Sequence, residues 1–144
     1  MEIIRKKLDK EAYCLTIPLI TDASGAKYGK SEGNAVRVDR KKNSPYFVYQ
    51  FFMNSDDALV EKLLKVFSLK SLDEIAEIVK KHMEKPELRY GQKELASRVV
   101  EVLFGKDAVA QAEKISKVLF GGAEIMETIS SFSKEDIDAL ASET

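Results

Sequence analysis

The sequence predicts a mainly α-helical protein, in which a small helical bundle follows one short strand and a glycine-containing loop. Three observations support this prediction. From Ser44 onward, apolar residues recur at helical spacing, and capping residues separate the segments. Residues 13–20 form a short apolar run rich in β-branched and aromatic side chains, which is typical of a buried strand. Residues 21–33 then contain a glycine at every fourth position from Gly25, which favours a loop.

The first element is a charged, helix-compatible stretch over residues 2–11, followed by the strand predicted for Tyr13–Ile20. Pro18 weakens the strand prediction, because proline has no backbone N–H to donate to a sheet and prefers edges and strand ends. Cys14 alternates with its neighbours in this strand, so we expect it to be a small buried apolar residue.

The first helix of the bundle is predicted to begin at Ser44-Pro45, where an N-cap residue precedes a first-turn proline. The aromatic residues of 46–52 would form one strongly buried helix. A base-stacking platform for RNA is the alternative, but the helical spacing favours a core position. Residues 54–57 (Asn-Ser-Asp-Asp) should end this helix and cap the next.

The later helices have equally clear starts. Ser71 and Glu74 have capping-box spacing. Pro86 should open a long helix that ends at Gly105, because proline suits a first turn and glycine a C-terminus. Further helices should begin at Asp107 and within residues 133–136. His82 lies near a helix C-terminus, and we interpret it as structural rather than catalytic.

Composition excludes several classes of protein. A chain of 144 residues is about one domain, and its 44% hydrophobic content rules out a disordered tail. No apolar run reaches the roughly 18–20 residues of a membrane span. A single cysteine and a single histidine exclude a disulfide framework and make a metal site or a histidine-containing triad hard to build. We therefore expect a cytoplasmic protein without a bound metal, and neither a membrane nor DNA as a partner.

The segment that suggests chemistry is Lys27-Tyr28-Gly29-Lys30-Ser31, directly after the predicted strand. Two lysines three residues apart can bring two ammonium groups to one polyphosphate, and Ser31 can add a hydroxyl hydrogen bond. Residues 1–42 contain ten basic and six acidic residues, which would also favour a phosphate-bearing ligand. Taken alone the pattern is a weak indication of function. Exposed Lys-Gly-Lys loops are common, and most of them are only solvent-exposed turns. The pattern does not match a P-loop.

The order of residues around this segment resembles the second signature loop of class I aminoacyl-tRNA synthetases. It is most similar to the bacterial-type tyrosyl-tRNA synthetases, in which the KMSKS motif is written K-F-G-K-[ST]. The similarity covers nearly the whole chain and is carried by Leu15–Leu19, Thr21-Asp22, Gly25, Lys27–Asn34, Ser44–Tyr46, Tyr49–Phe51, Asn54–Asp56 and, more weakly, Pro86–Leu88, Gln92-Lys93 and Leu119–Gly121.

The resemblance implies a division of the chain into two parts. Residues 1–43 would be the end of the catalytic domain, with the KMSKS-type loop, and thus the remnant of a class I Rossmann-like domain. Residues 44–144 would be the helical anticodon-binding domain. The implied function is that of a tyrosine–tRNA ligase, which activates tyrosine with ATP and Mg²⁺ and transfers it to tRNA(Tyr).

The resemblance also implies residue roles. Lys27 and Lys30 would bind the ATP phosphates and stabilise the pyrophosphate, and Ser31 would share that work as a third catalytic residue. Leu19 and Ile20 match a strand end that contacts adenine, so they would help to bind ATP. Asp56 falls where the helical domain of the family meets the tRNA anticodon.

Other features depart from the family pattern. Arg37 stands where tryptophan is usual, and no His-x-Gly-His motif occurs. The nucleotide-binding sheet and the tyrosine pocket that precede this segment in the family are missing. We therefore expect a fragment of the ligase that is inactive without its N-terminal half. The alternatives are a free-standing helical RNA-binding module and a protein-interaction bundle in which the lysine loop is only a turn.

Overall fold

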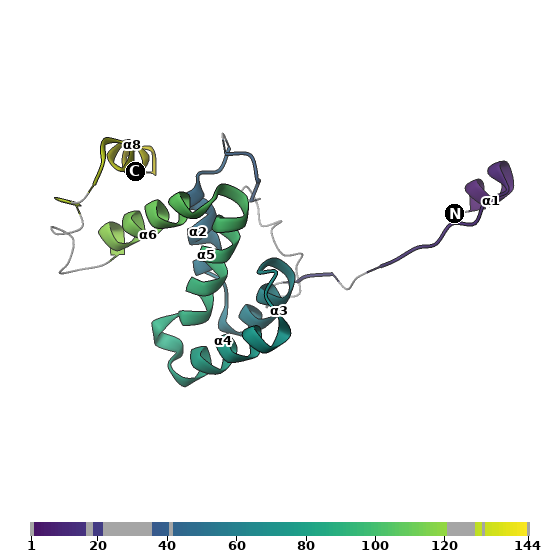
Figure 1. Ribbon diagram of the computed structural model, residues 1–144, viewed down its shortest axis with the longest axis horizontal. Helices are drawn as coiled ribbons and strands as arrows, with labels where there is room; N and C mark the ends of the chain where they lie inside the picture. Colours follow the sequence, from purple (N-terminus) through teal and green to yellow (C-terminus); the bar gives the residue numbers. More distant parts are fainter. Residues whose placement is uncertain are drawn as a thin grey trace.

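The computed structural model describes residues 2–16, 19–21, 36–40, 42–120, 129–130 and 132–143 (Figure 1). These residues are mostly helical, which confirms the predicted fold class. The elements are α1 (Glu2–Leu8), α2 (Pro45–Met53), α3 (Asp57–Phe67), α4 (Leu72–Glu84), the short 3₁₀ helix η1 (Pro86–Leu88), α5 (Tyr90–Phe104), α6 (Lys106–Phe120) and α8 (Lys134–Glu143).

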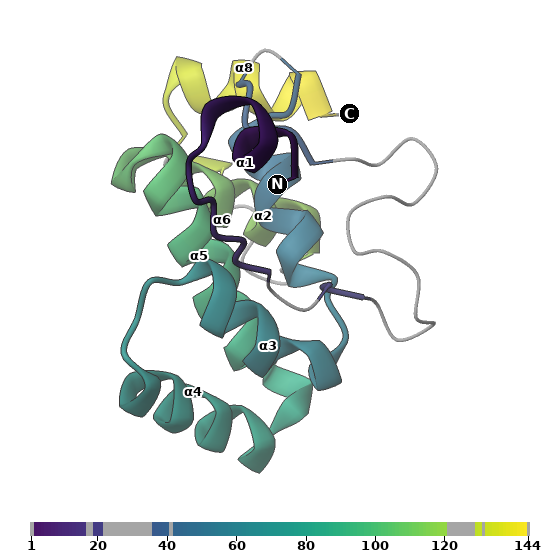
Figure 2. The same ribbon diagram turned by 90° about the vertical axis from the view of Figure 1, so that its right-hand side faces the viewer.

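Helix α5 is the centre of the bundle, because it packs against α2, α3, α4 and α6. Figures 1 and 2 both place α4 at one end of the bundle and α6, followed by α8, at the other. Figure 1 shows α1 and the residues after it on an arm that extends away from α4 and α5. Within the described residues, the folded core is therefore the α2–α6 unit.

The core consists of apolar side chains that the five helices point toward one another. Burial of such side chains contributes roughly 1.5–3 kcal/mol each for the larger ones, which is the main stabilising term of a small bundle. Of the aromatic residues predicted for the core within 46–52, Tyr46, Tyr49 and Phe52 are buried there, whereas Phe47 and Phe51 are only half-buried. The buried set is Tyr46, Val48, Tyr49, Phe52, Val60, Leu63, Leu64, Ile75, Ile78, Leu95, Ala96, Val99, Val100, Ala108, Ala112 and Ile115.

The predicted helix starts are confirmed by their hydrogen bonds. The N–H of Phe47 donates to Ser44 Oγ at 2.9 Å, with Pro45 in the first turn. At the start of α4, the N–H of Glu74 donates to Ser71 Oγ at 3.3 Å, and the N–H of Ser71 donates to Glu74 Oε2 at 2.8 Å. The bonds that the Glu74 carboxylate accepts from the Ser71 N–H and from the Ser71 hydroxyl lower the pKa of Glu74, since they favour its charged form.

The long helix predicted from Pro86 is wrong at its start. Pro86 opens only the 3₁₀ turn η1, and Arg89 then takes the left-handed conformation with φ 51°. A left-handed residue cannot continue a right-handed helix, so α5 begins at Tyr90. The predicted end is confirmed, because Gly105 has φ 91° and its N–H donates to the carbonyl of Glu101 at 2.9 Å.

The strand predicted over Tyr13–Ile20 is also wrong for the residues that the structure describes there. Residues 13–16 and 19–20 form no strand, and Thr21 is an isolated bridge residue. Tyr13 and Leu15 are 89% and 93% exposed, and Cys14 is exposed rather than buried. A strand depends on hydrogen bonds to a neighbouring strand, and none of the described segments supplies one.

The described helices include none that is long and apolar enough to cross a membrane.

Ionisation of Tyr49 should destabilise the bundle at alkaline pH. Burial, together with the nearby Glu113 carboxylate, raises the pKa of Tyr49 from 10.0 to about 12, although a hydrogen bond with Ser97 opposes the shift. The unfolded state therefore loses this proton first, and its contribution to stability is present below pH 10 and lost as the pH rises toward 12.

Urea unfolding of the wild type and Tyr49→Phe across this pH range should show the effect. We expect the wild type to lose up to about 1.4 kcal/mol per pH unit more than the variant, the value for one proton. Parallel pH profiles for the two proteins would contradict the prediction.

Candidate functional site

Two of the four residues predicted to bind ATP, Lys27 and Lys30, lie outside the described residues, as does Ser31, the third predicted catalytic residue. The structure describes Leu19 and Ile20, which are neighbours with different surroundings. The side chain of Leu19 is 58% exposed, whereas Ile20 is half-buried and packs against the core of the bundle. Their proposed contact with adenine stays a prediction.

Asp56, the residue predicted to contact tRNA, lies in the turn between α2 and α3. Helix α2 ends at Asn54, whose N–H donates to the carbonyl of Gln50 at 2.9 Å, and in the turn the N–H of Ser55 donates to the carbonyl of Phe52 at 3.2 Å. Asp56 is the N-cap of α3 and has extended backbone geometry, but its exposed side chain makes no capping hydrogen bond. Its carboxylate is therefore not used in capping the helix that it precedes.

A surface hollow of about 360 Å³ lies between this turn and the segment that joins α4 to α5. Among the described residues, three carboxylates and one guanidinium group line the hollow, so their summed charge is negative. Such a surface is unsuited to a phosphate group but suited to the N–H donors of a nucleic-acid base. The residues that line it are Asn54, Ser55, Asp56, Asp57, Pro86, Glu87 and Arg89.

Two buried polar side chains lie beneath the turn. The amide of Gln92, which is fully buried on α5, donates to Asp57 Oδ1 at 2.5 Å and to the carbonyl of Ser55 at 3.3 Å. His82, from α4, is 1% exposed, and its Nε2 lies 3.2 Å from Asp57 Oδ1. This pair is close but not aligned as a hydrogen bond. The burial of the His82 side chain agrees with the interpretation of His82 as a structural residue of the bundle.

The sequence predicts a role for Asp56 but does not indicate the groups that lie beneath it. In the sequence, Gln92 is only one of the residues that carry the family resemblance, without a predicted role. A signal was present, because Gly91-Gln92 interrupts the apolar face of a helix, and a glycine inside a helix has a packing reason when it is retained. The left-handed Arg89 had no such signal, since a non-glycine residue rarely adopts this conformation.

At Gly91, helix α5 lies too close to Val60 of α3 and His82 of α4 to leave room for a side chain. A Cβ atom at this position would lie 2.7 Å from Val60 Cγ1 and 3.1 Å from His82 Cγ. Gly91→Ala should therefore lower the free energy of unfolding by about 1–3 kcal/mol, the usual cost of overpacking, rather than raise it as alanine does in an open helix.

Chemical denaturation would test this expectation against a matched control. Gly105→Ala introduces the same methyl group at φ 91° with no atom within 4 Å, so it adds backbone strain without a clash. If Gly91→Ala proved as stable as the wild type, the close packing would be disproved.

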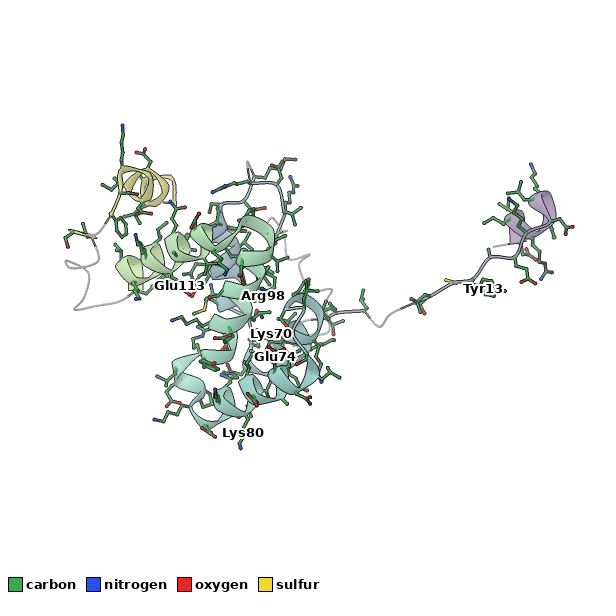
Figure 3. All side chains as sticks on the ribbon, viewed as in Figure 1. Tyr13, Lys70, Glu74, Lys80, Arg98 and Glu113 are labelled. Atoms are coloured by element: carbon green, nitrogen blue, oxygen red, sulfur yellow. The ribbon has the colours of Figure 1, made fainter. Side chains whose placement is uncertain are left out.

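A second hollow, of about 330 Å³, is lined mainly by charged residues of α5, α6 and the segment between α3 and α4. Its charges largely pair with one another. Arg98 donates to Glu101 at 2.8 Å and to the carbonyl of Ser68 at 2.9 Å, which lowers the pKa of Glu101. Lys70 lies 3.8 Å from Glu94. Figure 3 shows Lys70, Arg98 and Glu113 on the bundle and Tyr13 far away on the N-terminal arm. We interpret this hollow as structural.

A third hollow, of about 400 Å³, is apolar and is lined by residues of α2, α3, α5 and the segment before α2, among them Val36, Phe51 and Leu103. Across the described ranges, no group of three or more histidine, cysteine or acidic side chains is arranged to hold a metal ion.

Comparison with known proteins agrees with the sequence resemblance. The family model described as "tRNA synthetases class I (W and Y)" matches residues 1–121. A tyrosine–tRNA ligase of Lactococcus lactis subsp. cremoris is 49% identical over 124 residues, which are 86% of this chain and 30% of that protein. A tyrosine–tRNA ligase of Streptococcus pneumoniae is 48% identical over 121 residues, which are 84% of this chain and 29% of that protein.

Solved structures give the same result for the fold. A C-terminally truncated mitochondrial tyrosyl-tRNA synthetase of Coccidioides posadasii superimposes with a TM-score of 0.59 and 36% identity, over 69% of this chain and 26% of that one. A C-terminally truncated mitochondrial tyrosyl-tRNA synthetase of Aspergillus nidulans superimposes with a TM-score of 0.58 and 33% identity, over 60% of this chain and 26% of that one. The chain thus spans less than a third of the length of these relatives. With the family match over residues 1–121, these results show that the chain belongs to the class I tRNA synthetase family that includes the tyrosyl-tRNA synthetases.

Proposed function

We propose that this chain supplies two parts of a bacterial-type tyrosine–tRNA ligase, the loop that binds the ATP phosphates and the helical domain that contacts tRNA(Tyr). The observation that carries the proposal is the 49% identity to the ligase of Lactococcus lactis over 86% of the chain. We place the boundary at residues 43 and 44, directly before the N-cap of α2, so that residues 1–43 belong to the catalytic domain and residues 44–144 to the helical domain.

The proposed role of the loop rests on charge. Lys27 and Lys30 would place two ammonium groups against the phosphates of ATP, with Ser31 adding a hydrogen bond. Fixed donors of this kind act where negative charge develops, here on the departing pyrophosphate. Leu19 and Ile20 would contact adenine, and Mg²⁺ would enter with ATP as part of the substrate.

The proposed role of the helical domain rests on the hollow beside Asp56. RNA is recognised in sequence-specific fashion mostly through unstacked bases, whose Watson–Crick edges carry N–H donors. The exposed carboxylate of Asp56 would accept such a donor. Arg89, on the opposite side of the hollow, is the one cation among the described residues that line it and would face the base.

The chain of 144 residues should not form tyrosyl-adenylate by itself. Much of an enzyme's rate acceleration comes from holding both reactants in position, and the His-x-Gly-His motif of the family is absent from these residues. Activity would require the N-terminal part of the relatives as a partner. A location in the cytoplasm, where translation takes place, stays our prediction.

Two measurements with the purified chain test the proposal. We expect no tyrosine-dependent exchange of pyrophosphate into ATP above background, and exchange by the chain alone would contradict the predicted inactivity. We expect labelled tRNA(Tyr) to bind with an affinity that falls as salt is raised, because phosphate contacts release counterions. A protein-interaction bundle would show no such binding.

Asp56→Asn tests the residue assignment within the same binding assay. The amide keeps the size of the side chain but weakens acceptance of a hydrogen bond from a base, so binding should weaken. Asp73→Asn is the matched control, because Asp73 is an exposed acidic residue in the first turn of α4 that does not line the hollow. Equal effects of the two substitutions would point to general charge rather than to recognition by Asp56.

A further inference from the structure

We propose that Gln92 is a positioning residue for the turn of residues 54–57, which it holds from beneath in the conformation that presents Asp56. Gln92 does not line the hollow itself. The part of this inference that concerns RNA rests on the proposed function, whereas the part that concerns the order of the turn does not.

The hydrogen bonds of Gln92 lie on both sides of Asp56. Its single amide nitrogen donates to the backbone carbonyl of Ser55 and to the side-chain carboxylate of Asp57. These acceptors are one residue before and one residue after Asp56. One side chain from α5 therefore fixes the two ends of a three-residue segment, and the exposed residue between them has little freedom to reorient.

The burial of Gln92 supports a role beyond filling space. The side chain is fully buried, and its Oε1 has no hydrogen-bond partner among the described residues. A buried polar atom without a partner destabilises the fold, and an apolar side chain of similar shape would avoid that cost. The two hydrogen bonds that the amide nitrogen makes to the turn therefore offset the cost of burying this polar side chain.

His82 approaches the Asp57 acceptor of Gln92 from a second helix. The His82 ring packs directly over Gly91, where no side chain would fit, and its Nε2 lies 3.2 Å from Asp57 Oδ1. The Asp57 carboxylate is thus approached by polar groups from two helices, α4 and α5. Because α4 and α5 both pack against α3, this arrangement couples the turn to the rigid part of the bundle.

The test compares Gln92→Met with Gln50→Met in the full chain. Methionine has nearly the shape of glutamine but cannot donate a hydrogen bond. Gln50 is the matched control, because its amide also makes a part-buried bond between helices, to Ser116 Oγ at 3.0 Å, but on the α6 side of the bundle. The readouts are hydrogen exchange of the backbone amides of residues 54–59 and affinity for tRNA(Tyr).

If Gln92 positions the turn, Gln92→Met will speed exchange at residues 54–59 and weaken tRNA binding by about tenfold, the equivalent of one or two hydrogen bonds. Gln50→Met will change neither beyond its effect on overall stability. Exchange at residues 54–59 equal to that of the wild type in Gln92→Met would overturn the inference, whatever happens to RNA binding.

Two further outcomes are informative. If the wild-type chain does not bind tRNA but Gln92→Met still loosens the turn, the positioning role is supported and the proposed function fails. If Gln92→Met does not fold, Asp57→Ala replaces it, because Asp57 is half exposed and its loss removes one of the two bonds without opening the core. Faster exchange in Asp57→Ala would support the inference, and unchanged exchange would overturn it.

Discussion

Replacement of both Lys27 and Lys30 by alanine should reduce tyrosyl-adenylate formation by a factor of about 10²–10³ for each lysine, the usual loss when one preorganised donor to a developing charge is removed. The cause would be loss of positive charge at the phosphates of ATP, where the leaving pyrophosphate gains negative charge. Since the chain spans 30% of its Lactococcus lactis relative, the experiment requires a chimera. This chain replaces the matching part of that ligase, and pyrophosphate exchange is measured.

The double variant Lys41→Ala/Lys42→Ala is the control for this experiment. It removes the same amount of charge outside the signature segment, so exchange should stay close to that of the unmodified chimera. Thermal unfolding should be the same for all three proteins, because none of the substitutions lies in the helical core. Exchange at the unmodified rate in the Lys27/Lys30 variant would show that the signature assignment is wrong.

Leu95→Ala should lower the free energy of unfolding by about 2–5 kcal/mol, a large part of the roughly 5–15 kcal/mol that holds a domain together. Leu95 is 0% exposed and lies on α5, the helix that contacts all four of its neighbours in the bundle. Truncation of the Leu95 side chain removes buried apolar surface and leaves a cavity, which the four surrounding helices cannot fill by moving inward. Urea denaturation would measure the difference.

Leu88→Ala provides the comparison, because Leu88 is 67% exposed in the short η1 segment. The same atoms are removed there, but little apolar surface is returned to water, so we expect a change within about 0.5 kcal/mol. A loss of less than 1 kcal/mol in Leu95→Ala would mean that the centre of the bundle can repack, which would contradict the packing around α5.

The helices were predictable because their signals are local. Ser44-Pro45 and the Ser71/Glu74 pair bond to backbone atoms within the first turn of their own helices, so the capping pattern is sufficient to locate them. The burial of the aromatic residues in α2 followed from their helical spacing. Two predictions that required more than local information were wrong, namely the helix start at Pro86 and the strand over Tyr13–Ile20.

The candidate site was predictable only in part. Asp56 was predicted through resemblance to a family, and its role, like that of the lysine segment, stays a prediction from sequence. The partners of Asp57 could not be inferred, because Gln92 and His82 lie 35 and 25 residues further along the chain. Nothing in the spacing of residues within one helix indicates which side chains of another helix will meet it.

The sequence by itself determined the helical class of this protein, most of its helix boundaries, its aromatic core and its resemblance to class I tRNA synthetases, because capping, periodicity and motif order depend on residues close in the chain. Only the tertiary structure decided that Gln92 and His82 meet beneath the turn of Asp56, and that the apolar residues Tyr13 and Leu15 are exposed. Both outcomes depend on contacts between distant segments, and such contacts exist only when the helices have packed together.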